Sequence, residues 1–237
     1  MVLAVFSFSN SRFAIWQGFT LRWYTGIFQN AALMESALNS IIIAIAATAI
    51  STVIGTLAGY AIWKHRSPFL TNTLYLTLLT PEIVTGISLL AFFQWIFRYL
   101  SVQLGMHTVI LAHVSFSIAY VVIVIVARLR TFDASLEEAG LDLGANEWQV
   151  FCRVTLPNLW PGVAAAALLC FTVSFDDYVI TSLVAGVDSE TLPMVIYALA
   201  RRGVNPTVNA LSAVITVGLG TLILLAERLQ KTERGAA

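Results

Sequence analysis

Charged side chains are scarce in this sequence, since only 11% of its 237 residues are Asp, Glu, Lys or Arg, whereas 58% are hydrophobic. Soluble domains carry roughly a quarter charged residues, so this composition disfavours a soluble globular protein. Cysteine is scarce too, and we expect Cys152 in a loop and Cys170 in an apolar segment, where they do not pair. The composition therefore points to a lipid bilayer as the solvent, and away from a disulfide-based fold.

The sequence also lacks the signatures of several chemistries. Its three histidines, His65, His107 and His113, have neither His-Glu-x-x-His spacing nor a Cys-rich neighbourhood, so we expect packing or interfacial roles and no metal site. Neither Lys64 nor Lys231 follows a glycine, so a Walker A phosphate-binding loop is absent. We expect no catalytic residue, no cofactor bound by this chain and no nucleic-acid partner.

Long apolar runs are what the sequence has in abundance. Crossing hydrocarbon takes about 20 residues of helix. Five runs reach that length, and they are residues 36–63, 67–97, 100–127, 154–185 and 203–226. We therefore predict an all-α integral membrane protein with five spanning helices in residues 36–237. Residues 1–35 are expected to hold the remnant of a first helix and an aromatic-rich segment at the outer interface.

Glycine and proline predict the shape of the first two spans. Gly55 and Gly59 are four residues apart, which lets a second helix approach closely. Pro81 and Gly86 are expected to bend the second span. The placement of Lys and Arg predicts that the segment before Glu35 lies outside the cell.

One sizeable loop on the cytoplasmic side follows the third span. Asp133 is placed to cap a helix that ends at Gly144. Asn146 is placed to start a second helix, which we expect to stop before Leu156-Pro157 because proline does not continue a helix interior. A plain connector between two spans has no need of this plan, whereas an element that docks a cytoplasmic partner does.

The spacing within this loop resembles the EAA loop of permease subunits of ATP-binding-cassette (ABC) importers. The residues that carry the resemblance are Glu138, Ala139, Gly140, Gly144, Leu156 and Pro157. The sequence departs from the pattern at Gly140, where alanine is usual, and at Val154, where isoleucine is usual. The resemblance implies a type I (MetI-like) permease fold. It also implies that residues 133–157 couple to an ATPase, with Glu138 to Gly144 forming the helix that enters its groove.

The likeness extends over nearly the whole chain and is greatest to the polyamine branch of this family, notably in TPEIVTGISLL and SFDDYVITSLVAG. It implies import of spermidine or putrescine across the bacterial cytoplasmic (inner) membrane. The implied partners are a sister permease, two copies of a cytoplasmic ATPase that bind ATP and Mg, an external substrate-binding protein and membrane lipid. Because that family has six spans, we expect most of the first one to be missing from this sequence.

Acidic residues within the apolar runs are candidates for the substrate path, since a charge at the centre of a bilayer costs about 2.5–3.5 kcal/mol on insertion scales. These acids are Glu82, Asp176 and Asp177, and the aromatic residues Trp95, Phe175, Tyr178 and Tyr197 are candidates for contact with a cationic substrate. The alternative is that the acids cap broken helices or pair with arginine. Adjacent residues on a helix point about 100° apart, so at most one of Asp176 and Asp177 is expected to face the path.

Rival functions remain open on the sequence alone. A related permease could carry another solute, such as an opine, Fe(III) or an inorganic anion, and the acids would then be structural. An intramembrane enzyme could use the carboxylates as acid, base or metal ligands, but the EAA-like loop would then have no role. A membrane-anchored interaction or sensor protein would not need the acids, and the sequence shows no signalling domain.

Overall fold

The computed structural model describes residues 5–11, 16–65, 68–100, 102–201 and 206–235, and beyond Thr221 the only side chain it describes is that of Leu224. Apart from one isolated bridge between Ser9 and Phe19, every regular element in these residues is helical. The helices are α2 (Arg22–Gln29), α3 (Ala31–His65), α4 (Pro68–Leu79), α5 (Glu82–Leu100), α6 (Met106–Leu129), α7 (Ser135–Asp142), α8 (Glu147–Val150), the π-helical turn η1 (Phe151–Thr155), α9 (Leu156–Asp176), α10 (Val179–Val184), α11 (Leu192–Arg201) and α12 (Pro206–Gly235).

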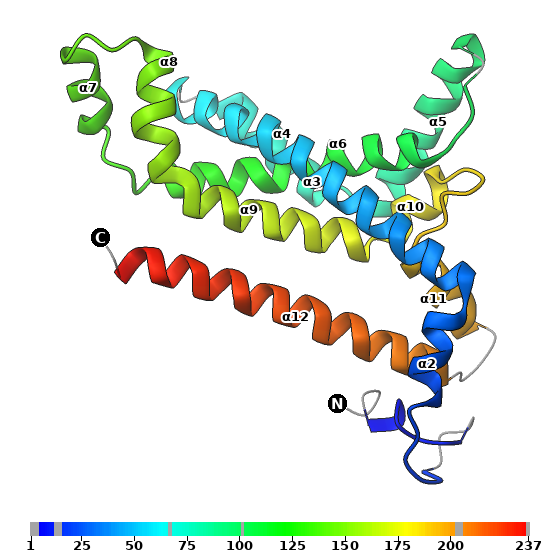
Figure 1. Cartoon of the computed structure of the whole chain (residues 1–237). Helices are drawn as coiled ribbons and strands as arrows, with labels where there is room; N and C mark the ends of the chain where they lie inside the picture. Colours follow the sequence, from blue (N-terminus) through cyan, green and yellow to red (C-terminus); the bar gives the residue numbers. More distant parts are fainter. Residues whose placement is uncertain (1–4, 12–15, 66–67, 101, 202–205, 236–237) are drawn as a thin grey trace.

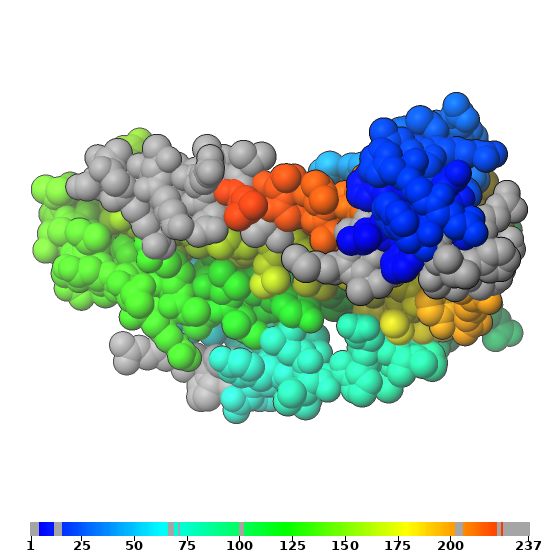
Figure 2. All heavy atoms as spheres, turned by 90° about the horizontal axis from the view of Figure 1, so that it is seen from below, coloured from blue at the N-terminus to red at the C-terminus, as the bar shows by residue number. Residues whose placement is uncertain are grey.

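Three helices in the described residues are long and apolar enough to cross a membrane, namely Ala31–His65, Met106–Leu129 and Glu147–Asp176. They lie side by side in Figure 1, with α7 and α8 at one end of the bundle and α2, α10 and α11 at the other. Seen along a perpendicular direction, α12 and the N-terminal segment lie on one side and α4 and α5 on the other (Figure 2). The loop that contains α7 and α8 and the N-terminal segment are thus at opposite ends of the three long helices.

The second predicted span is broken into α4 and α5, which meet at 101°. The break falls at Thr80–Pro81, so the bend expected at Pro81 is confirmed. Gly86 does not bend the chain as expected. It lies inside α5, where a Cβ would lie 2.6 Å from Leu183 Cδ1, so its role is to let α10 pack closely against α5.

The predicted close approach at Gly55 and Gly59 is confirmed. A Cβ on Gly55 would lie 2.6 Å from Val121 Cβ, and a Cβ on Gly59 would lie 2.8 Å from Ile125 Cγ2. Val121 and Ile125 belong to α6 and are fully buried. The absence of two side chains on α3 therefore allows α3 and α6 to pack closely against each other in the bundle core.

Gly55→Ala is expected to destabilise the protein, because an inserted methyl group in a close-packed interface costs about 1–3 kcal/mol. The measurement is the thermal unfolding midpoint of the purified protein in detergent. Gly218→Ala in α12 is the matched control, since a Cβ there meets nothing within 4 Å. Equal midpoints for the two variants would contradict the packing role of Gly55.

The helix after the cytoplasmic loop differs from the prediction that it stops before Leu156-Pro157. The chain stays helical from Glu147 to Asp176, passing through the π-helical turn Phe151–Thr155. In this turn the N–H of Leu156 donates to Phe151 O, five residues back. Pro157 is the second residue of α9, directly after the π-helical turn. The predicted break was wrong because a π-helical turn cannot be recognised from proline placement alone.

Candidate functional site

Asp176 and Asp177 lie at the break between α9 and α10. α9 ends at Asp176, and Asp177 adopts an extended conformation with φ −67° and ψ 125°. The side chain of Asp177 turns into the protein, where it accepts hydrogen bonds from the backbone N–H of Thr181 at 2.8 Å and from its hydroxyl at 2.7 Å. Asp177 therefore caps the first turn of α10, which is the structural alternative considered for this residue.

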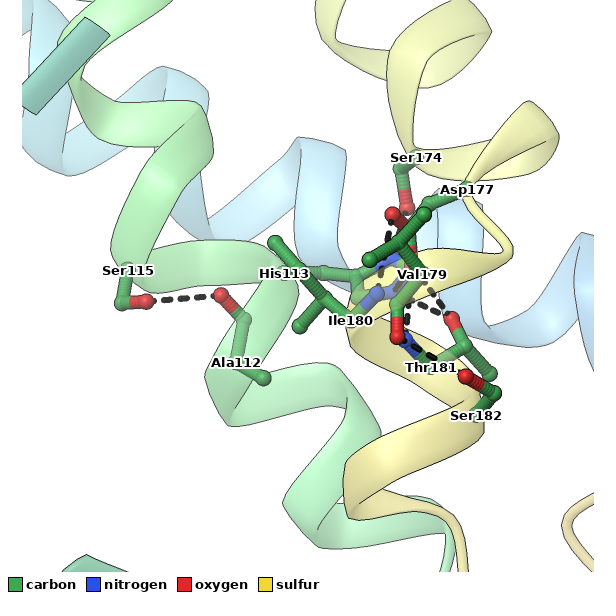
Figure 3. A network of polar contacts seen from close by, with 9 residues as sticks. All are labelled: Ala112, His113, Ser115, Ser174, Asp177, Val179, Ile180, Thr181 and Ser182. Atoms are coloured by element: carbon green, nitrogen blue, oxygen red, sulfur yellow. Dashed lines mark hydrogen bonds and ion pairs between the residues drawn. The ribbon is translucent and has the colours of Figure 1, made fainter. Parts of the chain in front are cut away.

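A buried histidine on α6 completes the surroundings of Asp177. His113 is 1% exposed, and its Nε2 lies 2.9 Å from Thr181 Oγ1 and 3.4 Å from Asp177 Oδ2 (Figure 3). Its Nδ1 lies 2.6 Å from Ser174 Oγ. The Thr181 hydroxyl gives its single proton to Asp177, so it accepts from His113, and Nε2 carries a hydrogen. When the ring is neutral, Nδ1 accepts from Ser174, and one chain of hydrogen bonds links α6, α9 and α10.

The role of His113 was missed by sequence reasoning, which expected a packing or interfacial residue. The available signal was an ionisable side chain inside an apolar run, because such residues are rare in membranes and need partners. The acids within the apolar runs were predicted to be functional for this reason, but His113 was not. Its partners are hydroxyl and carboxylate groups more than 60 residues away in the sequence, which no local pattern shows.

Glu82 and Asp176 line one shared cavity of about 540 Å³ between α4, α5, α6 and the α9–α10 break. Both side chains are exposed, and neither forms a hydrogen bond or ion pair with any residue that the structure describes. Asp177 also lines the cavity, although its carboxylate is paired, and the other polar lining residues are Thr77, Thr80, Thr85, Ser115, Tyr120, Thr172 and Tyr178. The cavity thus combines two unpaired carboxylates with a wall of hydroxyl groups. Of the two adjacent aspartates, Asp176 presents a free carboxylate to it.

The aromatic candidates are divided between this cavity and its neighbour. Tyr178 lines the shared cavity and also a second one of about 380 Å³, which Asp176, Phe175 and Tyr197 line too. The rings of Tyr178 and Tyr197 lie 4.2 Å apart, and the Arg201 guanidinium lies 4.7 Å from the centre of the Tyr197 ring. Tyr178 and Asp176 therefore sit where the two cavities meet.

Trp95 lies outside both cavities. Its side chain is 62% exposed on α5 and packs edge-on against Tyr99. The opposite face of the same helix carries Phe93, which is buried in the core with Ile180. The structure therefore brings Glu82, Asp176 and Tyr178 together, and leaves Trp95 on the outer surface of the bundle.

The cytoplasmic loop has the predicted plan of two short helices that meet at a glycine. Gly144 has φ +85°, a left-handed conformation that glycine adopts without strain, and it follows the end of α7. Asn146 caps α8, since its side chain accepts from Gln149 N at 2.8 Å and its N–H donates to Gln149 Oε1 at 3.0 Å. Both predictions are confirmed. The helix expected at Glu138 to Gly144 instead spans Ser135–Asp142.

Asp133 sits one position earlier than a capping residue. The N-cap of α7 is Ala134, and Asp133 Oδ1 accepts a hydrogen bond from Ser135 N at 3.0 Å. Hydrogen bonds from the Ser135 side chain and backbone lower the pKa of Asp133 from its ordinary value. The carboxylate is therefore ionised at neutral pH near the positive end of α7.

The loop exposes four of the residues that the EAA resemblance singles out, namely Glu138, Ala139, Gly144 and Pro157. Glu138 and Ala139 are exposed, and Leu143 is 89% and Trp148 65% exposed. Leu156 and Pro157 lie at the other end of the pattern, in the first turn of α9. Gly140 faces inward, where a Cβ would lie 3.1 Å from Val150 Cγ2, so it allows α7 to rest closely on α8.

Comparison with known proteins places residues 51–232 in a family described as binding-protein-dependent transport system inner membrane component. The chain is 38% identical over 233 residues to the spermidine/putrescine transport system permease protein PotC of Escherichia coli (strain K12), covering 97% of this chain and 86% of that protein. It is 36% identical over 233 residues to the putrescine transport system permease protein PotI of the same strain, covering 95% and 83%.

Two solved structures share the arrangement of helices. A bacterial ABC transporter involved in the import of the acidic polysaccharide alginate has a chain that matches with a TM-score of 0.69 at 16% identity, covering 97% of this chain and 88% of that one. A chain of the inward-facing MetNI methionine ABC transporter matches with a TM-score of 0.63 at 17% identity, covering 87% and 98%. At these identities the similarity shows the fold alone.

Proposed function

The chain belongs to the family of binding-protein-dependent transport system inner membrane components, as a multi-pass permease subunit of an ABC importer, and from this premise we propose that it carries polyamines such as spermidine and putrescine. The predicted all-α permease fold is confirmed by its similarity to other ABC transporters. The polyamine assignment is supported by the names of its relatives and by the chemistry of the shared cavity.

The observation that carries the proposal is the pair of unpaired carboxylates on one cavity. Polyamines are flexible chains that carry ammonium groups, and each ammonium donates up to three hydrogen bonds. Glu82 and Asp176 offer two anionic acceptors, the surrounding hydroxyls offer neutral ones, and Tyr178 offers a ring face for a cation. An anionic solute would be repelled by the same carboxylates, so the cavity favours a cationic amine over the anion alternative.

We propose the partners that the family resemblance implies. The exposed apolar residues Leu143 and Trp148, next to Glu138, form a surface suited to a groove on a cytoplasmic ATPase. Two copies of that ATPase bind ATP and Mg, so this chain needs no cofactor and performs no catalysis. A sister permease completes the transmembrane path, a substrate-binding protein delivers the amine from outside, and lipid surrounds the apolar helices.

The proposal is tested by uptake of labelled putrescine into proteoliposomes that hold the complete complex with its binding protein. We expect ATP-dependent uptake that excess spermidine inhibits and that excess 1,4-butanediol leaves unchanged. The diol has the same chain length as putrescine and no charge, so it is the matched control. Uptake of an anion or of an Fe(III) complex in place of putrescine would overturn the polyamine assignment. Turnover of a substrate by the chain alone in detergent would support the enzyme alternative instead.

A further inference from the structure

The two adjacent glutamates of α7 have opposite surroundings. Glu138 is exposed and has no hydrogen-bond or ion-pair partner in the described part of the chain, whereas Glu137 is only 8% exposed. The carboxylate of Glu137 accepts a hydrogen bond from the hydroxyl of Thr155, which is fully buried. Burying a carboxylate is costly unless it is hydrogen-bonded, so this contact is needed for Glu137 to stay inside. The EAA resemblance singles out Glu138 and assigns nothing to Glu137.

The partner of Glu137 occupies an unusual backbone position. Thr155 is the last residue of the π-helical turn Phe151–Thr155. Such turns are rare and are frequent at functional sites. The turn is part of the continuous helix Glu147–Asp176, which ends at the free carboxylate of the shared cavity. The hydrogen bond therefore joins the cytoplasmic helix α7 directly to the spanning helix that lines the cavity.

Contacts of the loop with α3 are of a different kind. The rings of Tyr60 and Phe151 lie 4.7 Å apart, and Lys64 Nζ lies 3.8 Å from the largely exposed carboxylate of Glu147. These rings are tilted by 46° and form no hydrogen bond to each other, and an exposed ion pair contributes little. The hydrogen bond between Glu137 and Thr155 is thus the directional contact that holds α7 to the helix leading into α9.

We propose that Glu137 is a positioning residue that transmits movement of α7 to α9 through Thr155. This role rests on the proposed function, in which α7 docks on the ATPase. A charge-assisted hydrogen bond has a fixed direction and length, so it carries a displacement of α7 along α9 to the α9–α10 break. Gly140, which lets α7 rest against Val150, keeps the two groups within reach of each other.

The test compares transport per ATP hydrolysed in proteoliposomes that hold the complete complex. Glu137→Leu and Thr155→Val each remove the hydrogen bond and keep the size of the side chain. We expect both complexes to retain the ATPase and to hydrolyse ATP, while transport per ATP falls about tenfold, as loss of one charge-assisted bond implies. Glu137→Gln keeps an acceptor for Thr155 and is expected to retain most of the coupling. Glu138→Leu is the neighbouring control and is expected to weaken ATPase binding instead.

A spectroscopic measurement separates this inference from the proposed function. Spin labels at Thr85 and Thr172 face the cavity from α5 and α9, after Cys152 and Cys170 are replaced by serine. In the parent complex we expect ATP to change the distance between the labels, and in Glu137→Leu we expect no change. The inference would be overturned if Glu137→Leu and Thr155→Val kept the transport per ATP of the parent complex and its ATP-dependent change in label distance. It would also be overturned if both variants lost ATPase binding or thermal stability. An ATP-dependent distance change without putrescine uptake in the parent complex would overturn the polyamine assignment alone.

Discussion

Combined replacement of Glu82 by Gln and of Asp176 by Asn is expected to lower putrescine uptake by about 100-fold, since each charge-assisted hydrogen bond to an ammonium contributes about 1.5–3 kcal/mol. Each single variant is expected to lower uptake about tenfold. Both side chains are exposed to the cavity and have no partner among the described residues, so their replacement removes no contact on which folding depends. The measurement is the initial rate of ATP-dependent uptake into proteoliposomes, at equal amounts of assembled complex.

The matched control for these variants is Glu35→Gln. Glu35 is also an exposed acid, but it lies near the N-terminal end of α3 and lines neither cavity. We expect uptake to stay within about twofold of the parent, because a lone exposed charge contributes little. Unchanged uptake in the double variant would show that the cavity is not the route of the amine. Loss of uptake in Glu35→Gln as well would point to a general effect of surface charge.

Local chemistry explains which parts of the fold the sequence predicts. Pro81 lacks a backbone N–H, Gly144 adopts positive φ, and Asn146 reaches the backbone three residues ahead, so each feature depends on a few consecutive residues. Of the five apolar runs, three contain helices that are long and apolar enough to cross a membrane, and a fourth, residues 67–97, contains the bent pair α4 and α5. In the run 203–226, the described apolar helix, Pro206–Thr221, is shorter than a span. The predicted boundaries are less accurate, since α3 begins at Ala31 rather than at residue 36.

The remaining features depend on contacts between distant segments. No local pattern shows that Glu137 rather than Glu138 is buried. Adjacent residues of a helix point in different directions, so the orientation of α7 determines which glutamate is buried, and the partner Thr155 lies 18 residues further along the chain. The same holds for Asp176 and Asp177, where the end of α9 turns one side chain outward and the other inward. The π-helical turn has the composition of an ordinary helix. These features are set by tertiary packing, which overrides local preference.

Replacement of His113 by Phe is expected to lower the thermal unfolding midpoint of the purified complex by several degrees. The ring keeps its size, but Ser174, Thr181 and Asp177 lose a buried partner, and each buried polar group left unsatisfied costs about 1–3 kcal/mol. His107→Phe is the control, since His107 is exposed at the start of α6. An equal midpoint for the parent and His113→Phe would contradict the structural role of the hydrogen-bond chain.

A double-mutant cycle decides whether the ring and the carboxylate act together. If His113 stabilises the protein through Asp177, then His113→Phe costs less in a protein that already carries Asp177→Asn, and the difference is expected to be about 1 kcal/mol or more. The cycle also bears on transport, because the network holds the α9–α10 break against α6 and so fixes the place of Asp176 in the cavity. His113→Phe should therefore lower putrescine uptake although His113 does not line the cavity. Additive costs with normal uptake would mean that the break is held by packing alone.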